Sequence, residues 1–206
     1  MIESSSSLHL LKCKIAQLEQ SKAATTIKYA TTGHAGIDHA LGGGLARGRL
    51  HELFADEPMD AGSAAGFAAM LAQRLGGGIV WLREEYVQRQ GGALFAPGLA
   101  ETGLDPARLI LGLLPDPLAV LRAAADVICC SEAGIAVIEL WRNPRLMDLT
   151  ASRRLALAAE GSGVTALLLR VAAEPMPSAA QTRWSVRSAT PAAPAAQGPG
   201  PPPIGG

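Results

Sequence analysis

Residues 55–62 have the position and length of a phosphate-binding loop, because they stand between an apolar run and a segment with helical spacing. They are Ala55, Asp56, Glu57, Pro58, Met59, Asp60, Ala61 and Gly62. In a working loop of this kind, backbone N–H groups surround the phosphates, a lysine reaches the terminal ones, and the following Ser or Thr holds Mg²⁺. Ala61 and Gly62 stand at these last two positions, so the two side chains that the chemistry needs are missing.

The acidic character of this loop also argues against nucleotide chemistry. Carboxylate and phosphate groups repel each other strongly when both are partly desolvated, and the loop itself holds no Lys or Arg. We therefore expect a degenerate phosphate loop, with neither ATP nor Mg²⁺ as a cofactor. In an alternative interpretation, the segment is only a polar connection whose acidic residues favour the first turn of the next helix.

Glu139 is the second candidate, because it stands near the end of the apolar run 135–140. A carboxylate that holds Mg²⁺ occupies this place in many ATPases. Without the lysine and the hydroxyl, such a carboxylate has little to coordinate. We interpret Glu139 as a residual polar group paired with Arg142 or Arg170.

Other patterns predict neither a catalytic residue nor a metal site. Glu84 and Glu85 follow the run 79–82, where an ATPase could keep a carboxylate to activate water, but we interpret them as a solvated strand end. Three histidines that are close in the sequence lack ligand spacing; they are His34, His39 and His51. Ser63 lies in A-G-S-A-A, which is not the frame of a nucleophile elbow.

The elements that must position these residues alternate between strand-like and helix-like runs. The strand-like runs are 50–54, 79–82, 109–113, 135–140 and 164–171. Helical spacing is found for Phe67, Met70, Leu71 and Leu75, and in residues 118–129 and 151–160. This alternation predicts an α/β fold with a mainly parallel sheet flanked by helices. A late run, 182–186, predicts an edge strand, which we expect to be antiparallel because the link before it is short and contains two prolines.

Composition and charge exclude several classes of protein. The chain has 206 residues, of which 49% are hydrophobic, so it can build one ordinary core. Its formal net charge of zero gives no reason to expect strong non-specific DNA binding. The adjacent Cys129 and Cys130 lie in an apolar run, and we expect them to pack in the core of a cytoplasmic protein. No apolar run approaches the roughly 20 residues that span a bilayer.

Both ends of the chain differ from its middle. Leu8, Leu11, Ile15 and Leu18 form the stripe of an amphipathic helix, which we expect to dock on the domain or on a partner. From Pro191 onward the chain is nearly all Pro, Ala and Gly, which predicts a disordered tail. The expected organisation is an N-terminal helix and linker over 1–28, an α/β domain over 29–190 and the tail over 191–206.

The segment 31–53 resembles the beginning of the RecA core. A threonine turn leads to a short helix, a glycine-rich stretch and a strand that carries a glutamate; the matching residues are Asp38, Leu41, Gly42, Gly44, Leu45, Gly48, Arg49 and Glu52. The degenerate loop, the late Thr182, Arg183 and Trp184, and the Pro-rich tail are similar to the ImuA family, also described as SulA-like. This resemblance implies a bacterial accessory of damage-induced translesion synthesis, acting with ImuB and an error-prone polymerase.

Three functions follow from these observations. We expect a non-catalytic, RecA-like accessory protein of the SOS response and DNA repair, which binds ImuB, the polymerase subunit and RecA, and associates with DNA only indirectly. It would have no small-molecule substrate and no membrane partner. The first alternative is a residual ATP-binding repair ATPase, supported by Glu84 and Glu139. The second alternative is a SulA-like inhibitor of cell division.

Overall fold

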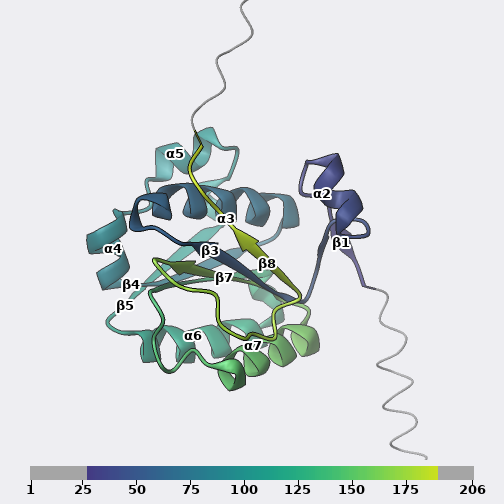
Figure 1. Cartoon of the computed structure of the whole chain (residues 1–206). Helices are drawn as coiled ribbons and strands as arrows, with labels where there is room; N and C mark the ends of the chain where they lie inside the picture. Colours follow the sequence, from purple (N-terminus) through teal and green to yellow (C-terminus); the bar gives the residue numbers. More distant parts are fainter. Residues whose placement is uncertain (1–26, 190–206) are drawn as a thin grey trace, which may run out of the picture.

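Six parallel strands form the central sheet, in the order β5-β4-β6-β7-β3-β8. We describe residues 27–189 of the chain in a computed structural model (Figure 1). The strands are β3 (Leu50–Ala55), β4 (Ile79–Glu84), β5 (Leu109–Leu114), β6 (Ile135–Trp141), β7 (Thr165–Val171) and β8 (Thr182–Ser185). The predicted α/β fold with a mainly parallel sheet is confirmed, and the five strand-like runs between residues 50 and 171 are all strands.

Helices cover both faces of this sheet (Figure 1). On one face lie α3 (Ala61–Leu75), α4 (Glu85–Gly91) and α5 (Ala96–Glu101); on the other lie α6 (Pro117–Cys129) and α7 (Leu149–Ser162). Short 3₁₀ turns precede α3, β5 and β6: η1 (Pro58–Asp60), η2 (Pro106–Arg108) and η3 (Ser131–Ala133). α4 and α5 were not predicted from the sequence, because these helices are too short for a clear apolar period.

Local sequence explains where α6 and α7 begin. The side chain of Asp116 accepts a hydrogen bond from Ala119 N at the start of α6, and Pro117 occupies the first turn. Asp148 accepts from Ala151 N in the same way at the start of α7. Both are preferred N-cap arrangements. Gly163, in the left-handed region, ends α7.

Two buried clusters form the core, one on each face of the sheet. Every residue of β6 and β7 is buried, as expected for central parallel strands. Against the first face, α3 presents a row of fully buried alanines, Ala64, Ala68 and Ala72, which let the helix approach the strands closely. The apolar face predicted for α3 from Phe67, Met70, Leu71 and Leu75 did not include these alanines. Phe67 and Met70 are only half-buried and lie at the margin of the buried face.

A small unit made of β1 (Tyr29–Ala30), α2 (Ala35–Ala40) and β2 (Leu45–Ala46) precedes the sheet. β1 and β2 pair antiparallel, and Asp38 closes the turn by accepting hydrogen bonds from both Thr32 N and Thr32 Oγ1 at 2.7 Å. Gly44 has a φ of +117°, and a Cβ there would collide with the Ala30 carbonyl group. This glycine of the segment 31–53 is therefore required by the backbone.

The predicted antiparallel direction of the late strand is wrong. β8 runs parallel to β3, with His51 opposite Thr182 and Leu53 opposite Trp184. An extended chain covers roughly 3.3–3.6 Å per residue, so residues 172–181 can return along the sheet without a crossover helix. Ala179 N, on this return path, donates to Ser152 Oγ of α7.

The expected burial of the cysteines is also wrong. Cys129 ends α6 and Cys130 follows it, and both side chains are exposed. The buried side of α6 is carried by Val120, Ala124 and Ile128, so a helical period decides burial at these positions, whereas the local apolar run does not.

Some predictions fall outside the described residues. The stripe of Leu8, Leu11, Ile15 and Leu18 and the tail 191–206 both lie beyond residues 27–189. Within the described range, no helix combines the length and the apolar composition that crossing a membrane would require.

Candidate functional site

The loop 55–62 follows the carboxyl end of β3, where ligands bind in open parallel sheets. Ala55 is the last residue of β3, η1 spans Pro58–Asp60, and Ala61 and Gly62 begin α3. Glu57 and Pro58 are exposed, and Met59 is 84% exposed. Asp60, in contrast, is buried at the N-terminus of α3. The loop therefore places Asp60 at the start of α3 and leaves Glu57, Pro58 and Met59 towards the outside.

The carboxylates of this loop bind a segment from the other end of the domain. We call residues 186–189, which follow β8, the C-terminal strap; Figure 1 shows this part of the chain passing α3 towards α5. Arg187 NH2 lies 2.9 Å from Asp56 Oδ2, and Ser188 N donates to Asp60 Oδ1 at 2.8 Å. These hydrogen bonds from Ser188 hold the pKa of Asp60 below its usual value. The cation that the loop lacks is therefore supplied from 131 residues away in sequence.

Two further contacts hold the C-terminal strap on the loop. Val186 N donates to Phe54 O at 2.7 Å, which continues the β8 pairing by one residue. Ser188 Oγ lies 2.9 Å from Ser63 Oγ of α3. Sequence reasoning missed Arg187 and Ser188, since no local pattern links them to residues 55–62.

Beside the start of α3 lies a cavity of about 230 Å³. Its α3 wall consists of small residues, Ala61, Gly62, Ala65 and Gly66, and Gly91–Phe95 lie on the opposite side. Arg83 and Glu139 also line it. In an ATPase, the carboxylate that holds Mg²⁺ would face this side of the loop. The partners of Arg83 and Glu139 therefore determine whether the cavity could bind a metal ion.

Arg83 and Glu139 neutralise each other. Arg83 NH2 lies 3.1 Å from Glu139 Oε1, and Trp81 Nε1 donates to Glu139 Oε2 at 2.8 Å. Both charged side chains are almost fully buried, at 2% and 1% exposure. Burial raises the pKa of Glu139, while Arg83 and Trp81 oppose the shift.

The predicted partners of Glu139, Arg142 and Arg170, are therefore wrong. Arg83 and Glu139 are direct partners in the parallel register of β4 and β6, so their side chains lie on the same face. Arg170 pairs in register with Leu140, the neighbour of Glu139, and points to the opposite face. Arg142, just after β6, is exposed.

The interpretation of Glu84 and Glu85 as a solvated strand end is right for Glu85 and wrong for Glu84. Glu85 is exposed and forms an i,i+4 ion pair with Arg89. Glu84 is buried, and its Oε1 has no hydrogen-bond partner among the described residues. Burial raises the pKa of the Glu84 carboxyl group.

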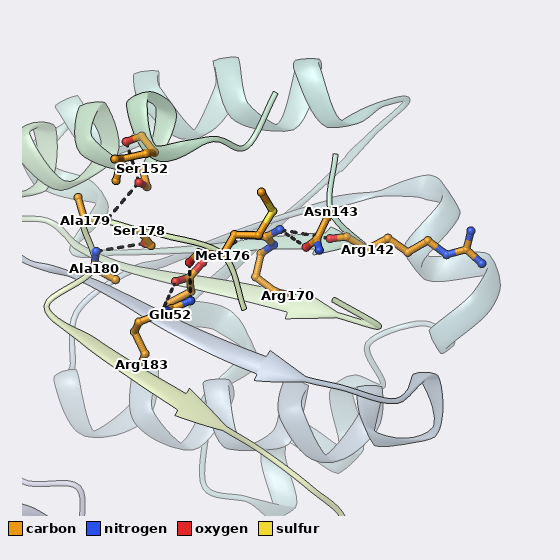
Figure 2. A network of polar contacts seen from close by, with 11 residues as sticks. Glu52, Arg142, Asn143, Ser152, Arg170, Met176, Ser178, Ala179, Ala180 and Arg183 are labelled. Atoms are coloured by element: carbon orange, nitrogen blue, oxygen red, sulfur yellow. Dashed lines mark hydrogen bonds and ion pairs between the residues drawn. The ribbon is translucent and has the colours of Figure 1, made fainter. Parts of the chain in front are cut away.

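A second charged network lies on the opposite face of the sheet (Figure 2). Glu52 of β3 accepts from Arg170 NH1 at 3.2 Å and from Arg183 Nε at 3.1 Å. Arg170 also donates to Asn143 Oδ1 at 2.6 Å, and Arg183 donates to Met176 O at 2.7 Å. The network thereby joins β3, β7 and β8 to the connections that follow β6 and β7.

Of the three histidines, His51 alone is buried, and it is bonded within the protein. His51 Nε2 lies 2.8 Å from the carbonyl of Ala46, so it carries the proton, and Nδ1 accepts from Thr182 Oγ1 at 2.8 Å. Trp184 Nε1 donates to the same Thr182 Oγ1. Burial lowers the pKa of His51 to about 4. Among residues 27–189, no group of His, Cys, Asp and Glu side chains could hold a metal ion.

The chain is similar in sequence to one protein described here and in fold to another. The protein ImuA of Caulobacter vibrioides, known from two strains, is 33% identical to this chain over 180 residues, which cover 80% of the chain and 67% of ImuA. The crystal structure of the RadB recombinase superposes with a TM-score of 0.51 at 20% identity, covering 69% of this chain and 70% of RadB. No family model matches the sequence.

The structural match establishes the fold, whereas the sequence match establishes the family. The structural likeness to RadB establishes a RecA-like fold, which agrees with the resemblance of the segment 31–53. The likeness to ImuA extends over most of both chains. The chain belongs to the ImuA family.

Proposed function

We propose that this protein is a non-catalytic accessory of damage-induced translesion synthesis, which acts in DNA repair and the SOS response by binding other proteins. Membership of the ImuA family supports this role. The partners would be ImuB and an error-prone polymerase subunit, with RecA as a third, and association with DNA would be indirect. A location in the bacterial cytoplasm fits these partners.

The observation that carries the absence of catalysis is the C-terminal strap on residues 55–62. A triphosphate in this loop would have to displace Arg187 and Ser188 and would then face Asp56 and Asp60. The remaining carboxylate, Glu139, is neutralised by Arg83 and bonded to Trp81. We infer a pseudo-ATPase that needs neither ATP nor Mg²⁺.

Co-purification with tagged ImuB tests the proposal. The full chain should co-elute with ImuB equally with and without ATP and Mg²⁺. We expect replacement of Leu8, Leu11, Ile15 and Leu18 by Glu to abolish co-elution, because a docking stripe needs its apolar face. Replacement of Lys12 and Lys14 by Glu, on the same segment, is the matched control and should retain ImuB. No co-elution of the wild type, or co-elution only with ATP, would contradict the proposal.

A further inference from the structure

An apolar groove lies between α6 and α7, away from the loop 55–62. It has a volume of about 360 Å³ and lies on the face of the sheet opposite α3 (Figure 1). Four leucines line it: Leu118 and Leu121 from α6, Leu155 from α7, and Leu146 from the connection before α7. Leu118 is 40% exposed and Leu146 is 51% exposed, so the groove presents apolar surface to the outside.

The rim of the groove is positively charged. Arg122 of α6 and Arg154 of α7 line it, whereas no Asp or Glu does. Neither arginine belongs to an ion pair among the described residues. The groove thus combines an apolar floor with two cations on different helices.

The acidic groups nearest in sequence do not neutralise this rim. Asp148 caps α7 through Ala151 N, and Glu160 pairs with Arg49. Asp126 stands one helical turn after Arg122 without forming an ion pair with it. An acidic ligand would therefore meet two cations that the protein itself leaves without a carboxylate partner.

We infer that this groove docks an acidic amphipathic helix of a partner protein. In helix-in-groove recognition, an amphipathic helix lays its apolar face into a hydrophobic groove and uses anchors at i, i+3 or i+4, and i+7. The occupant would place leucine-type side chains on Leu121 and Leu155, and Asp or Glu beside Arg122 and Arg154. This inference rests on the proposed role in protein interaction and assigns it a surface and a partner chemistry.

The same surface fits nucleic acid poorly. Single-stranded nucleic acid is held by aromatic side chains that stack on bases, interleaved with cations. The groove contains no aromatic residue, and its floor is made of leucines and alanines. Charge complementarity together with an apolar floor therefore favours an acidic protein segment.

Selection from a phage-displayed library of random 16-residue peptides on the immobilised full-length protein tests this inference. The enriched peptides should be net negative, with Leu, Ile or Met at helical spacing. Their affinity, measured by fluorescence anisotropy, should fall at least about tenfold for the double variant Arg122→Glu/Arg154→Glu, because two attractions become repulsions. Arg153→Glu, an exposed change on α7 outside the groove, should leave it within about twofold.

Several outcomes would overturn the inference. They are the absence of any enriched peptide, the enrichment of neutral or basic peptides, and equal binding by the double variant. A 20-nucleotide single-stranded DNA that binds the wild type and not the double variant, without peptide binding, would instead assign the groove to nucleic acid. Because the selection does not use ImuB, its failure is distinguishable from failure of the proposed function.

Discussion

Buried Glu52 is held by two guanidinium groups, the buried one of Arg170 from β7 and the partly exposed one of Arg183 from β8. The cations of Arg170 and Arg183 also lie 5.9 Å and 5.0 Å from the centroid of the Phe54 ring. Burial lowers the pKa of Arg170, and Glu52 opposes this shift by stabilising the charged form. Glu52, one of the residues on which the resemblance to the RecA core rests, therefore has a structural role: its carboxylate compensates the buried charge of Arg170.

Substitution of Glu52 by Gln tests this role. Removing one partner of a buried ion pair leaves the other charge uncompensated, which costs about 3–5 kcal/mol of unfolding free energy. Urea unfolding should show a loss in this range. The control is Glu160→Gln, whose pair with Arg49 is partly exposed and should contribute less than about 1 kcal/mol. A similar small loss for both variants would contradict the account.

Protonation of His51 should destabilise the fold in mild acid. The pKa of His51 is about 4 in the folded protein and 6.5 in the unfolded chain, so the unfolded state binds the proton first as pH falls. Stability is full above about pH 6.5 and is lost progressively towards pH 4, by about 2 kcal/mol between pH 7 and pH 5. The raised pKa of Glu84 acts in the opposite direction in this range.

The contribution of His51 is therefore best measured as a difference between two proteins. Unfolding free energies of the wild type and of His51→Gln should be compared at pH 7 and pH 5. We expect the pH-dependent loss to be about 2 kcal/mol larger in the wild type. Equal pH dependence in both proteins would show that His51 is not held neutral.

At the scale of elements, the C-terminal strap and the loop 55–62 form one unit. Asp60 has an N-cap position but makes no side-chain cap hydrogen bond within α3. Its carboxylate binds Ser188 N instead, and its charge still lies at the positive end of the helix. The loop is therefore closed by protein groups where a phosphate would otherwise bind.

Substitution of Asp60 by Ala should release the C-terminal strap. The Ser188 amide would lose its acceptor, so its hydrogen exchange should accelerate at least about tenfold, which corresponds to about 1.4 kcal/mol of opening free energy. Mass spectrometry of the peptide covering Val186 and Ser188 measures this rate. Glu57→Ala, at an exposed loop position, should leave it unchanged. Unchanged exchange in the Asp60 variant would contradict the assigned contact.

The elements themselves could largely be predicted from the sequence, because five apolar runs and three helical periods mark them. The direction of β8 could not, because a return path without a helix leaves no periodic signal. The pairing of Glu139 with Arg83 required the register of two strands that are 56 residues apart. Arg187 and Ser188 reach the loop only through tertiary structure, so no local pattern could place them at the candidate site.

At the scale of the whole molecule, the sheet separates two surfaces with different properties. On one face lie α3, the loop 55–62 with the C-terminal strap on it, and the Arg83–Glu139 pair. On the other face, α6 and α7 present the leucine groove with its arginine rim. If the protein acts by binding other proteins, as we propose, these two faces offer it separate surfaces.

Calorimetric titration of the purified full-length protein with ATP and Mg²⁺ measures whether the loop 55–62 binds a nucleotide, with RecA measured in parallel as the positive control. We predict no saturable binding of ATP up to about 1 mM, because Arg187, Ser188 and the carboxylates of Asp56 and Asp60 occupy the loop. Saturable binding with a micromolar Kd would contradict it, and would direct attention to the cavity lined by Arg83 and Glu139.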